Sequence, residues 1–117
     1  MLKRGAKWHF DKGKSLAISV LKKWRRDPQS DLFHLQCVIS LAIFESLRAL
    51  GQAQWHIKWP NDIMSGNKKL GGILIENFIK SELISSSIIG IGLNINEEKF
   101  KNLPNATSLF MEINKKV

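Results

Sequence analysis

The sequence predicts a single α+β domain, in which one long buried helix packs against a mixed, mainly antiparallel β-sheet. Three patterns lead to this class: an alternation of apolar and polar residues near the N-terminus, one long stretch with helical spacing, and several apolar runs separated by turn residues. With 117 residues, 44% hydrophobic and 24% charged, the chain is long enough to bury an apolar core without a metal or a disulfide.

The first predicted strand covers residues 14–21, where apolar side chains alternate with small or polar ones as in a half-buried strand. A helix follows from about Pro28 or Ser30 to Leu50, because an aspartate–proline pair is typical of a helix start and Gly51 of a stop. Its apolar residues recur at spacings of three and four, so we expect a largely buried helix. The apolar stripe consists of Leu32, Leu35, Val38, Ile39, Ala42, Ile43, Leu47 and Leu50, with Gln36, Ser40 and Glu45 off it.

The second half of the chain contains three further strand-like runs. Residues 55–59 form a short strand that ends at a proline, which lacks the donor that a sheet requires. Residues 65–67 are typical of a tight turn and predict a hairpin leading into the run 70–78. The run 84–95 contains two glycines, which favour bends or close backbone approach over a plain strand.

The charge is concentrated at one end of the chain. The net charge is +8, and residues 1–26 hold nine of the 18 basic residues but one of the ten acidic ones. This asymmetry indicates an anionic partner such as a nucleotide phosphate, a nucleic acid or an acidic protein surface, or else a solvated basic surface. The single cysteine, Cys37, fits a reducing compartment, and the uncharged run Leu32–Phe44 is too short to span a bilayer. We therefore expect a cytoplasmic protein without a membrane partner.

Residues Lys58–Asp62 bring a cation, a rigid turn, an amide and a carboxylate together at a strand end. Mg²⁺ takes one or two oxygen ligands from protein beside phosphate oxygens, and Asn61 and Asp62 could supply them. The alternative is an ordinary turn after a proline.

Lys69 lies just before Gly71 and Gly72, which open an apolar strand. A ligand carboxylate or phosphate could lie against the glycine backbone while the lysine ammonium neutralises it. Alternatively, Lys68 and Lys69 are exposed hairpin residues and the glycines form a bulge.

The segment Gly90–Asn96 lacks the third glycine of a dinucleotide-binding fingerprint, so a Rossmann fold is excluded. Asn94 lies on a predicted core strand, where its amide needs a partner, either a nucleotide or a neighbouring carbonyl. Trp8, among basic residues, suits stacking on a purine base, although core packing is the common alternative. The three histidines are scattered, which gives no support to a zinc site or a hydrolytic triad.

Four segments taken together resemble the catalytic domain of biotin protein ligases: Lys58–Asp62, Lys69–Glu76, Gly90–Asn96 and Ala106–Leu109. The similarity extends back to Arg4–Trp8 and therefore covers nearly the whole chain. It implies the fold shared by biotin ligases and class II aminoacyl-tRNA synthetases, present as a partial domain. The related lipoate ligases typically have Ala-Gln after the glycine, where this chain has isoleucine and leucine.

The resemblance implies a two-step reaction, in which ATP activates biotin to biotinyl-5′-AMP and a lysine of an acceptor protein, such as a carboxylase carrier domain, then takes the biotin. It implies Mg²⁺ as a cofactor and assigns catalysis to Lys58 and Lys69. The implied biotin-binding residues are Arg4, Gly5, Lys69, Gly71 and Gly72. The implied ATP-binding residues are Trp8, Lys58, Asn61, Asp62 and Asn94, of which Asn61 and Asp62 would also bind the metal.

The sequence also departs from the family pattern. Compared with the family pattern, the glycine- and arginine-rich loop is reduced to Met1–Arg4. We expect the preceding strand and helix, the last helices, the small C-terminal β-barrel and any DNA-binding domain to be absent from this chain. We therefore expect residues 1–117 to form a partial catalytic domain with little or no biotin transfer of its own. The alternatives are a degenerate ligase that still binds nucleotide, a related lipoate ligase, and a non-catalytic nucleotide- or nucleic-acid-binding module. Nucleic acid is the weaker candidate partner, and a homodimer stays open.

Overall fold

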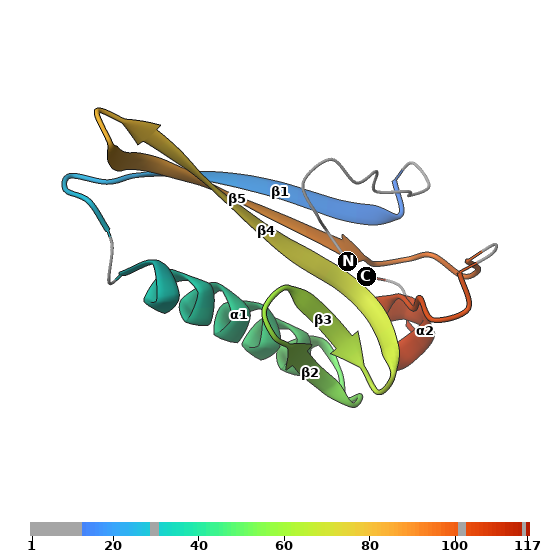
Figure 1. Ribbon diagram of the computed structural model, residues 1–117. Helices are drawn as coiled ribbons and strands as arrows, with labels where there is room; N and C mark the ends of the chain where they lie inside the picture. Colours follow the sequence, from blue (N-terminus) through green and yellow to red (C-terminus); the bar gives the residue numbers. More distant parts are fainter. Residues whose placement is uncertain (1–12, 29–30, 101–102, 116) are drawn as a thin grey trace.

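The computed structural model describes residues 13–28, 31–100, 103–115 and 117. Within these residues a five-stranded sheet has the strand order β1-β5-β4-β3-β2, and every pair of neighbouring strands is antiparallel (Figure 1). The strands are β1 (Ser15–Lys23), β2 (Trp55–Lys58), β3 (Asp62–Ser65), β4 (Lys68–Lys80) and β5 (Leu83–Asn94), and the helices are α1 (Asp31–Leu50) and α2 (Leu109–Ile113). An isolated parallel bridge joins Lys69 to Ala106. The predicted α+β class and mainly antiparallel sheet are confirmed.

The predicted hairpin at residues 65–67 is confirmed, with Gly66 at a φ of 57° between β3 and β4. The prediction that glycines bend the run 84–95 is wrong, because β5 continues unbroken through Gly90 and Gly92. A close approach of the two backbones is found at Gly71 of β4, where a Cβ would lie 2.1 Å from the Gly92 carbonyl oxygen; a close approach that requires glycine at positions 90 and 92 stays a prediction. Gly71 therefore allows β4 and β5 to approach each other without interrupting either strand.

The two faces of the sheet differ in side-chain size. Directly paired residues of an antiparallel sheet project to the same face, so Ile18, Ile91 and Ile73 form a bulky row across three strands. This face packs against Ile43 and Leu47 of α1 and contributes to one core. The buried core residues are Ile43, Leu47, Trp55, Ile63, Leu70, Ile73, Ile89, Leu93 and Leu109.

Helix α1 ends at Leu50, as predicted, and its first turn is closed by the Pro28 carbonyl, which accepts from the Asp31 N–H at 2.6 Å. The prediction of a largely buried helix is wrong: Val38 and Leu41 are 60% and 62% exposed. Ser40, which the pattern puts off the apolar stripe, is instead buried. The reason is that the buried residues Ser40, Ile43 and Leu47 share one face of α1. Val38 and Leu41 lie on the opposite face of the helix, away from the core.

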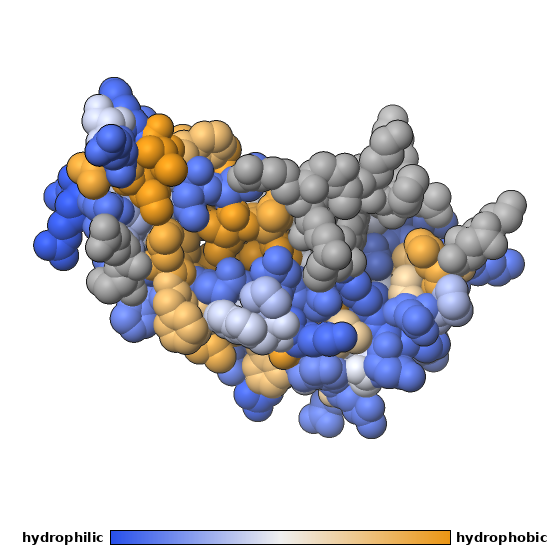
Figure 2. All heavy atoms as spheres, in the orientation of Figure 1, coloured by the Kyte–Doolittle hydropathy of each residue, from blue (hydrophilic) through white to orange (hydrophobic). Residues whose placement is uncertain are grey.

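An apolar groove of about 450 Å³ lies between α1 and the β1–β5 side of the sheet. Its lining includes Leu16, Ile18, Ile91 and Leu47, and Figure 2 shows hydrophobic residues gathered in this part of the surface. The alternation predicted for β1 is correct, but its apolar side chains are more exposed than in a half-buried strand; Leu16 and Ile18 are 41% and 40% exposed.

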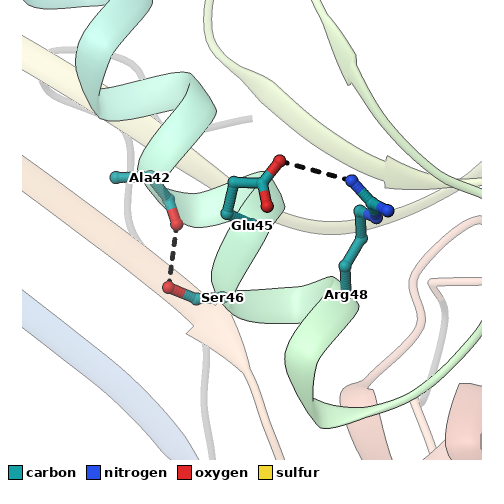
Figure 3. Close-up of polar contacts among 4 residues, drawn as sticks. All are labelled: Ala42, Glu45, Ser46 and Arg48. Atoms are coloured by element: carbon teal, nitrogen blue, oxygen red, sulfur yellow. Dashed lines mark hydrogen bonds and ion pairs between the residues drawn. The ribbon is translucent and has the colours of Figure 1, made fainter.

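Two exposed polar contacts lie near the C-terminal end of α1. Ser46 donates to the Ala42 carbonyl at 2.8 Å, and Arg48 pairs with Glu45 at 3.3 Å (Figure 3). By length and composition alone the whole helix is long enough to cross a membrane, unlike the shorter uncharged run considered above. Its Ile43, however, belongs to the core that it shares with the sheet.

Candidate active site

A row of small residues crosses the face of the sheet opposite α1 and ends in two charged ones. The register aligns Ala17, Gly92, Gly72, Asp62 and Lys58 on β1, β5, β4, β3 and β2. Paired residues share a face, so the first three form a flat surface without large side chains. Ala17 is exposed, whereas Gly92 and Gly72 are buried, so the part of the row next to Asp62 is shaped by the backbone of β4 and β5 rather than by side chains.

Lys69 is brought to this face by a β-bulge. Ile63 pairs with Gly71, but the next residue, Met64, pairs with Lys69, so Leu70 is left without a partner in β3. One extra residue in a strand reverses the alternation of side chains beyond it. Lys69 therefore projects to the face of the small-residue row, while Leu70 is fully buried in the core.

Lys69 and Asp62 form an ion pair, with Nζ 3.3 Å from Oδ1. Both side chains are mostly buried, 20% and 16% exposed, and the contact is an ion pair rather than an aligned hydrogen bond. Burial lowers the pKa of Lys69 from 10.5 to about 8, because desolvation disfavours the charged ammonium. The alternative interpretation, in which Lys68 and Lys69 are both exposed hairpin residues, is therefore correct for Lys68 and wrong for Lys69.

The loop before Asp62 is fastened on two sides. The Ile73 N–H donates to the Asn61 carbonyl at 2.9 Å, and Gln36 Nε2 donates to the Pro60 carbonyl at 2.6 Å. The Trp59–Pro60 peptide bond is cis. Asn61 is half-buried beside the ion pair, whereas Lys58 is exposed at the end of the same row.

Gly71 differs from Gly72 in its surroundings. Its Cβ position would meet the Gly92 carbonyl oxygen at 2.1 Å and Leu93 Cδ2 at 2.9 Å. The register also gives Gly71 the partner Leu93, on the face of the bulky row, while Gly72 belongs to the small-residue row. Packing alone therefore accounts for the glycine at position 71, and Gly72 is the one that faces the candidate site.

The segment 105–107 continues the sheet next to Lys69. The Lys69 N–H donates to the Asn105 carbonyl at 2.6 Å, and the Thr107 N–H donates to the Lys69 carbonyl at 2.9 Å. Asn94, 6% exposed, donates from Nδ2 to the Thr107 carbonyl at 3.1 Å. Of the two partners considered for this amide, the structure contains the neighbouring carbonyl.

Glu112 is a site-supporting residue that the sequence did not reveal. Its carboxylate accepts from Ser65 Oγ and, at 2.6 Å, from Thr107 Oγ1, so it joins α2 to β3 and to the segment beside Lys69. Ser108 accepts from the Met111 N–H at 3.2 Å and caps α2. The sequence does carry a signal for the cap, because a serine directly before a helix is a common N-cap residue. No local sequence pattern, however, links Glu112 to Ser65.

The structure thus brings together Lys58, Asp62, Lys69 and Gly72, and it places Asn61 next to Asp62 through its backbone carbonyl, which accepts from the Ile73 N–H. Arg4, Gly5 and Trp8 lie outside the described residues. Within the described ranges no three His, Cys, Asp or Glu side chains cluster as in a metal site built from protein ligands alone. The arrangement offers a desolvated cation and a carboxylate at the end of a flat glycine surface, which suits a ligand with a flat body and an anionic group.

Comparison with known proteins identifies the family of this chain. Residues 3–94 match the model of the Biotin/lipoate A/B protein ligase family. The chain is similar to the bifunctional ligase/repressor BirA of Escherichia coli, with 34% identity over 93 residues, 80% of this chain and 29% of the relative. It is also similar to the biotin–[acetyl-CoA-carboxylase] ligase of Paracoccus denitrificans, with 32% identity over 98 residues, 80% of this chain and 39% of the relative.

Among solved structures, the biotin protein ligase of Aquifex aeolicus in complex with biotin and ATP superposes with a TM-score of 0.76 and 28% identity. The match covers 98% of this chain and 47% of that structure. The fold is therefore that of a biotin ligase, and the chain spans less than half the length of these relatives.

Proposed function

Since this chain belongs to the Biotin/lipoate A/B protein ligase family, we propose that it carries part of the site at which a biotin–protein ligase joins biotin to ATP. The observation that carries the proposal is the Lys69–Asp62 ion pair at the end of the small-residue row. The fold similarity to a ligase solved with biotin and ATP supports the same assignment.

The proposed reaction has two steps. A carboxylate oxygen of biotin attacks the α-phosphorus of ATP, which forms the acyl–phosphate bond and releases pyrophosphate. The amine of an acceptor lysine then attacks the acyl carbon of biotinyl-5′-AMP, which releases AMP, while the amine loses a proton to solvent. The acceptor class would be a carrier domain of a carboxylase, in line with the name of the Paracoccus denitrificans relative.

Lys69 would serve the first step by lying between two anions. A carboxylate and a phosphate repel each other, and a preorganised cation lowers the barrier to their contact electrostatically. Its reduced pKa of about 8 still leaves the ammonium mostly protonated at neutral pH. An approaching anion would favour that charged form further.

The remaining residues would hold the nucleotide. We assign Lys58 and Asn61 to the phosphates because they flank Asp62 at the end of the row. Gly72 would let the flat ring of biotin lie against the backbone. Asn94 would act indirectly, through the segment that its amide fixes beside Lys69.

Mg²⁺ fits this donor set as an ion carried by the phosphates. Asp62 is a single half-buried carboxylate next to the amide of Asn61, and Mg²⁺ is commonly held by one or two protein oxygens plus substrate phosphates. When bound, the ion would supply positive charge that neutralises the phosphates. We therefore assign Asp62 and Asn61 as its protein ligands, and we expect the complete ligase to act in the cytoplasm.

Formation of labelled biotinyl-5′-AMP from biotin and α-labelled ATP tests the proposal. The full chain should form adenylate above the level obtained without biotin, and Lys69→Ala should abolish that excess. Gln52→Ala, an exposed glutamine beyond the end of α1, is the matched control and should leave it intact. Adenylate formation with lipoate but not with biotin would contradict the assigned substrate, and its absence with both acids in the folded chain would contradict the activity.

A further inference from the structure

Helix α1 reaches the loop before Asp62 through two side chains of one helical turn. Gln36 Nε2 donates to the Pro60 carbonyl at 2.6 Å, and the Phe33 ring packs on Trp59 with ring centroids 5.7 Å apart. Residues three apart on a helix share a face, so both contacts come from the same side of α1. The helix therefore holds two consecutive residues of the loop.

The other side of the loop is held by β4. The Asn61 carbonyl accepts from the Ile73 N–H at 2.9 Å, and Asp62, the next residue, pairs with Gly72. Residues 59–61 are thus fastened between a helix and a strand. A loop with a single fastening would have more conformational freedom, and the position of Asp62 relative to Lys69 would vary with it.

We propose that Gln36 is a positioning residue, which holds Asp62 beside Lys69 by fixing the Pro60 carbonyl from α1. Gln36 is half-buried and lies outside the four segments that carry the family resemblance. Its amide supplies a neutral donor, which binds a carbonyl without adding charge next to the ion pair. The effect on nucleotide binding rests on the proposed function, whereas the effect on the loop does not.

Two substitutions separate the hydrogen bond from the size of the side chain. Gln36→Ala removes the whole amide, and Gln36→Glu keeps its shape but turns the donor into a carboxylate that faces a carbonyl oxygen. Gln52→Ala is the matched control. Phe33→Leu keeps the hydrogen bond and removes the ring contact with Trp59.

Amide hydrogen exchange tests the positioning directly. Both Gln36 variants should speed exchange at the Ile73 N–H by about fivefold or more, because loss of one hydrogen bond frees the loop that accepts from it. Amides of β5, which pairs with β1 and β4, should keep their rates. A uniform acceleration across the sheet, or no change at Ile73, would overturn the proposal.

The functional consequence is measured as the affinity for Mg²⁺·ATP in Gln36→Ala, in Asp62→Asn and in the double variant. If Gln36 acts through Asp62, the double variant should lose no more affinity than Asp62→Asn alone. Additive losses would overturn the link to Asp62. Absence of Mg²⁺·ATP binding by the unsubstituted chain would contradict the proposed function, and exchange at Ile73 would still decide the role of Gln36.

Discussion

Lys69 Nζ lies 3.3 Å from Asp62 Oδ1, although regular alternation along β4 would project Lys69 to the opposite face of the sheet. The unpaired Leu70 reverses the alternation and makes the contact geometrically available. Leu70 itself is buried in the core on the other face of the sheet. One bulge thus joins a buried apolar side chain to a charged pair on the ligand-facing side.

We predict that Lys69 titrates with a midpoint near pH 8, well below the value near 10.4 of an ordinary lysine. Burial is the cause, because the uncharged amine is less penalised by desolvation. The measurement is NMR of ¹³C-methylated lysines, with the signal assigned by its loss in Lys69→Arg. A midpoint at the ordinary value would show that the side chain is solvated.

The same pKa predicts how stability depends on pH. The folded state releases the Lys69 proton near pH 8, whereas the unfolded chain keeps it to about pH 10.4, so the unfolded state binds more protons in between. The free energy of unfolding, relative to Lys69→Met, should therefore rise as the pH is raised through this window. Urea titrations at about pH 7.5 and about pH 9.5, one on either side of the Lys69 midpoint, measure this change in the free energy of unfolding.

Asp62→Asn should lower the pKa of Lys69 further. A neighbouring carboxylate favours the charged ammonium, and the amide keeps the size of the side chain without its charge. Asp31→Asn, an exposed residue at the start of α1, is the control and should leave the midpoint of Lys69 unchanged. An unchanged midpoint in Asp62→Asn would mean that the two side chains do not interact in solution.

Gly71→Ala should destabilise the fold by about 2 kcal/mol or more, whereas Gly51→Ala should cost less. The new methyl group at position 71 would meet the backbone oxygen of Gly92, which cannot move without disturbing both strands. At position 51 it would meet Ile113 Cγ2 at 2.6 Å and Cβ at 3.0 Å, which belong to the last residue of the short helix α2, and α2 can shift without disturbing two paired strands. Chemical denaturation of both variants measures the order, and equal costs would contradict the close approach of β4 and β5.

Glu112→Ala should lower the free energy of unfolding by about 2 kcal/mol, because it leaves the buried hydroxyls of Ser65 and Thr107 without their acceptor. Glu45→Ala is the matched control, since its pair with Arg48 is exposed and should contribute well under about 1 kcal/mol. Equal losses in the two variants would show that Glu112 does not join α2 to the sheet.

The sequence predicted those features that depend on local chemistry. Gly51 marks the end of α1, and Gly66 with its positive φ marks the β3–β4 turn, because both reflect the conformational needs of single residues. The motif at Lys58–Asp62 and the lysine at position 69 are also where the structure places its charged pair.

The features that could not be predicted depend on contacts between distant segments. The burial of α1 depends on what lies opposite each of its faces, so Val38 is exposed although its spacing favours burial. The β-bulge at Leu70 cannot be recognised from an alternating pattern of apolar and polar residues, yet it determines the face of the sheet to which Lys69 projects. Gln36 lay off the apolar stripe, and its partner, Pro60, is 24 residues away along the chain.

Thermal unfolding in the presence of a non-hydrolysable mimic of biotinyl-5′-AMP tests the central claim most directly. A ligand that binds only the folded state stabilises it by mass action, so the midpoint of the chain should rise by several degrees at saturating mimic. Lys69→Ala, folded under the same conditions, should show little or no rise. An unchanged midpoint at millimolar mimic, together with stabilisation by random RNA at low salt, would contradict an adenylation site and favour a nucleic-acid-binding module instead.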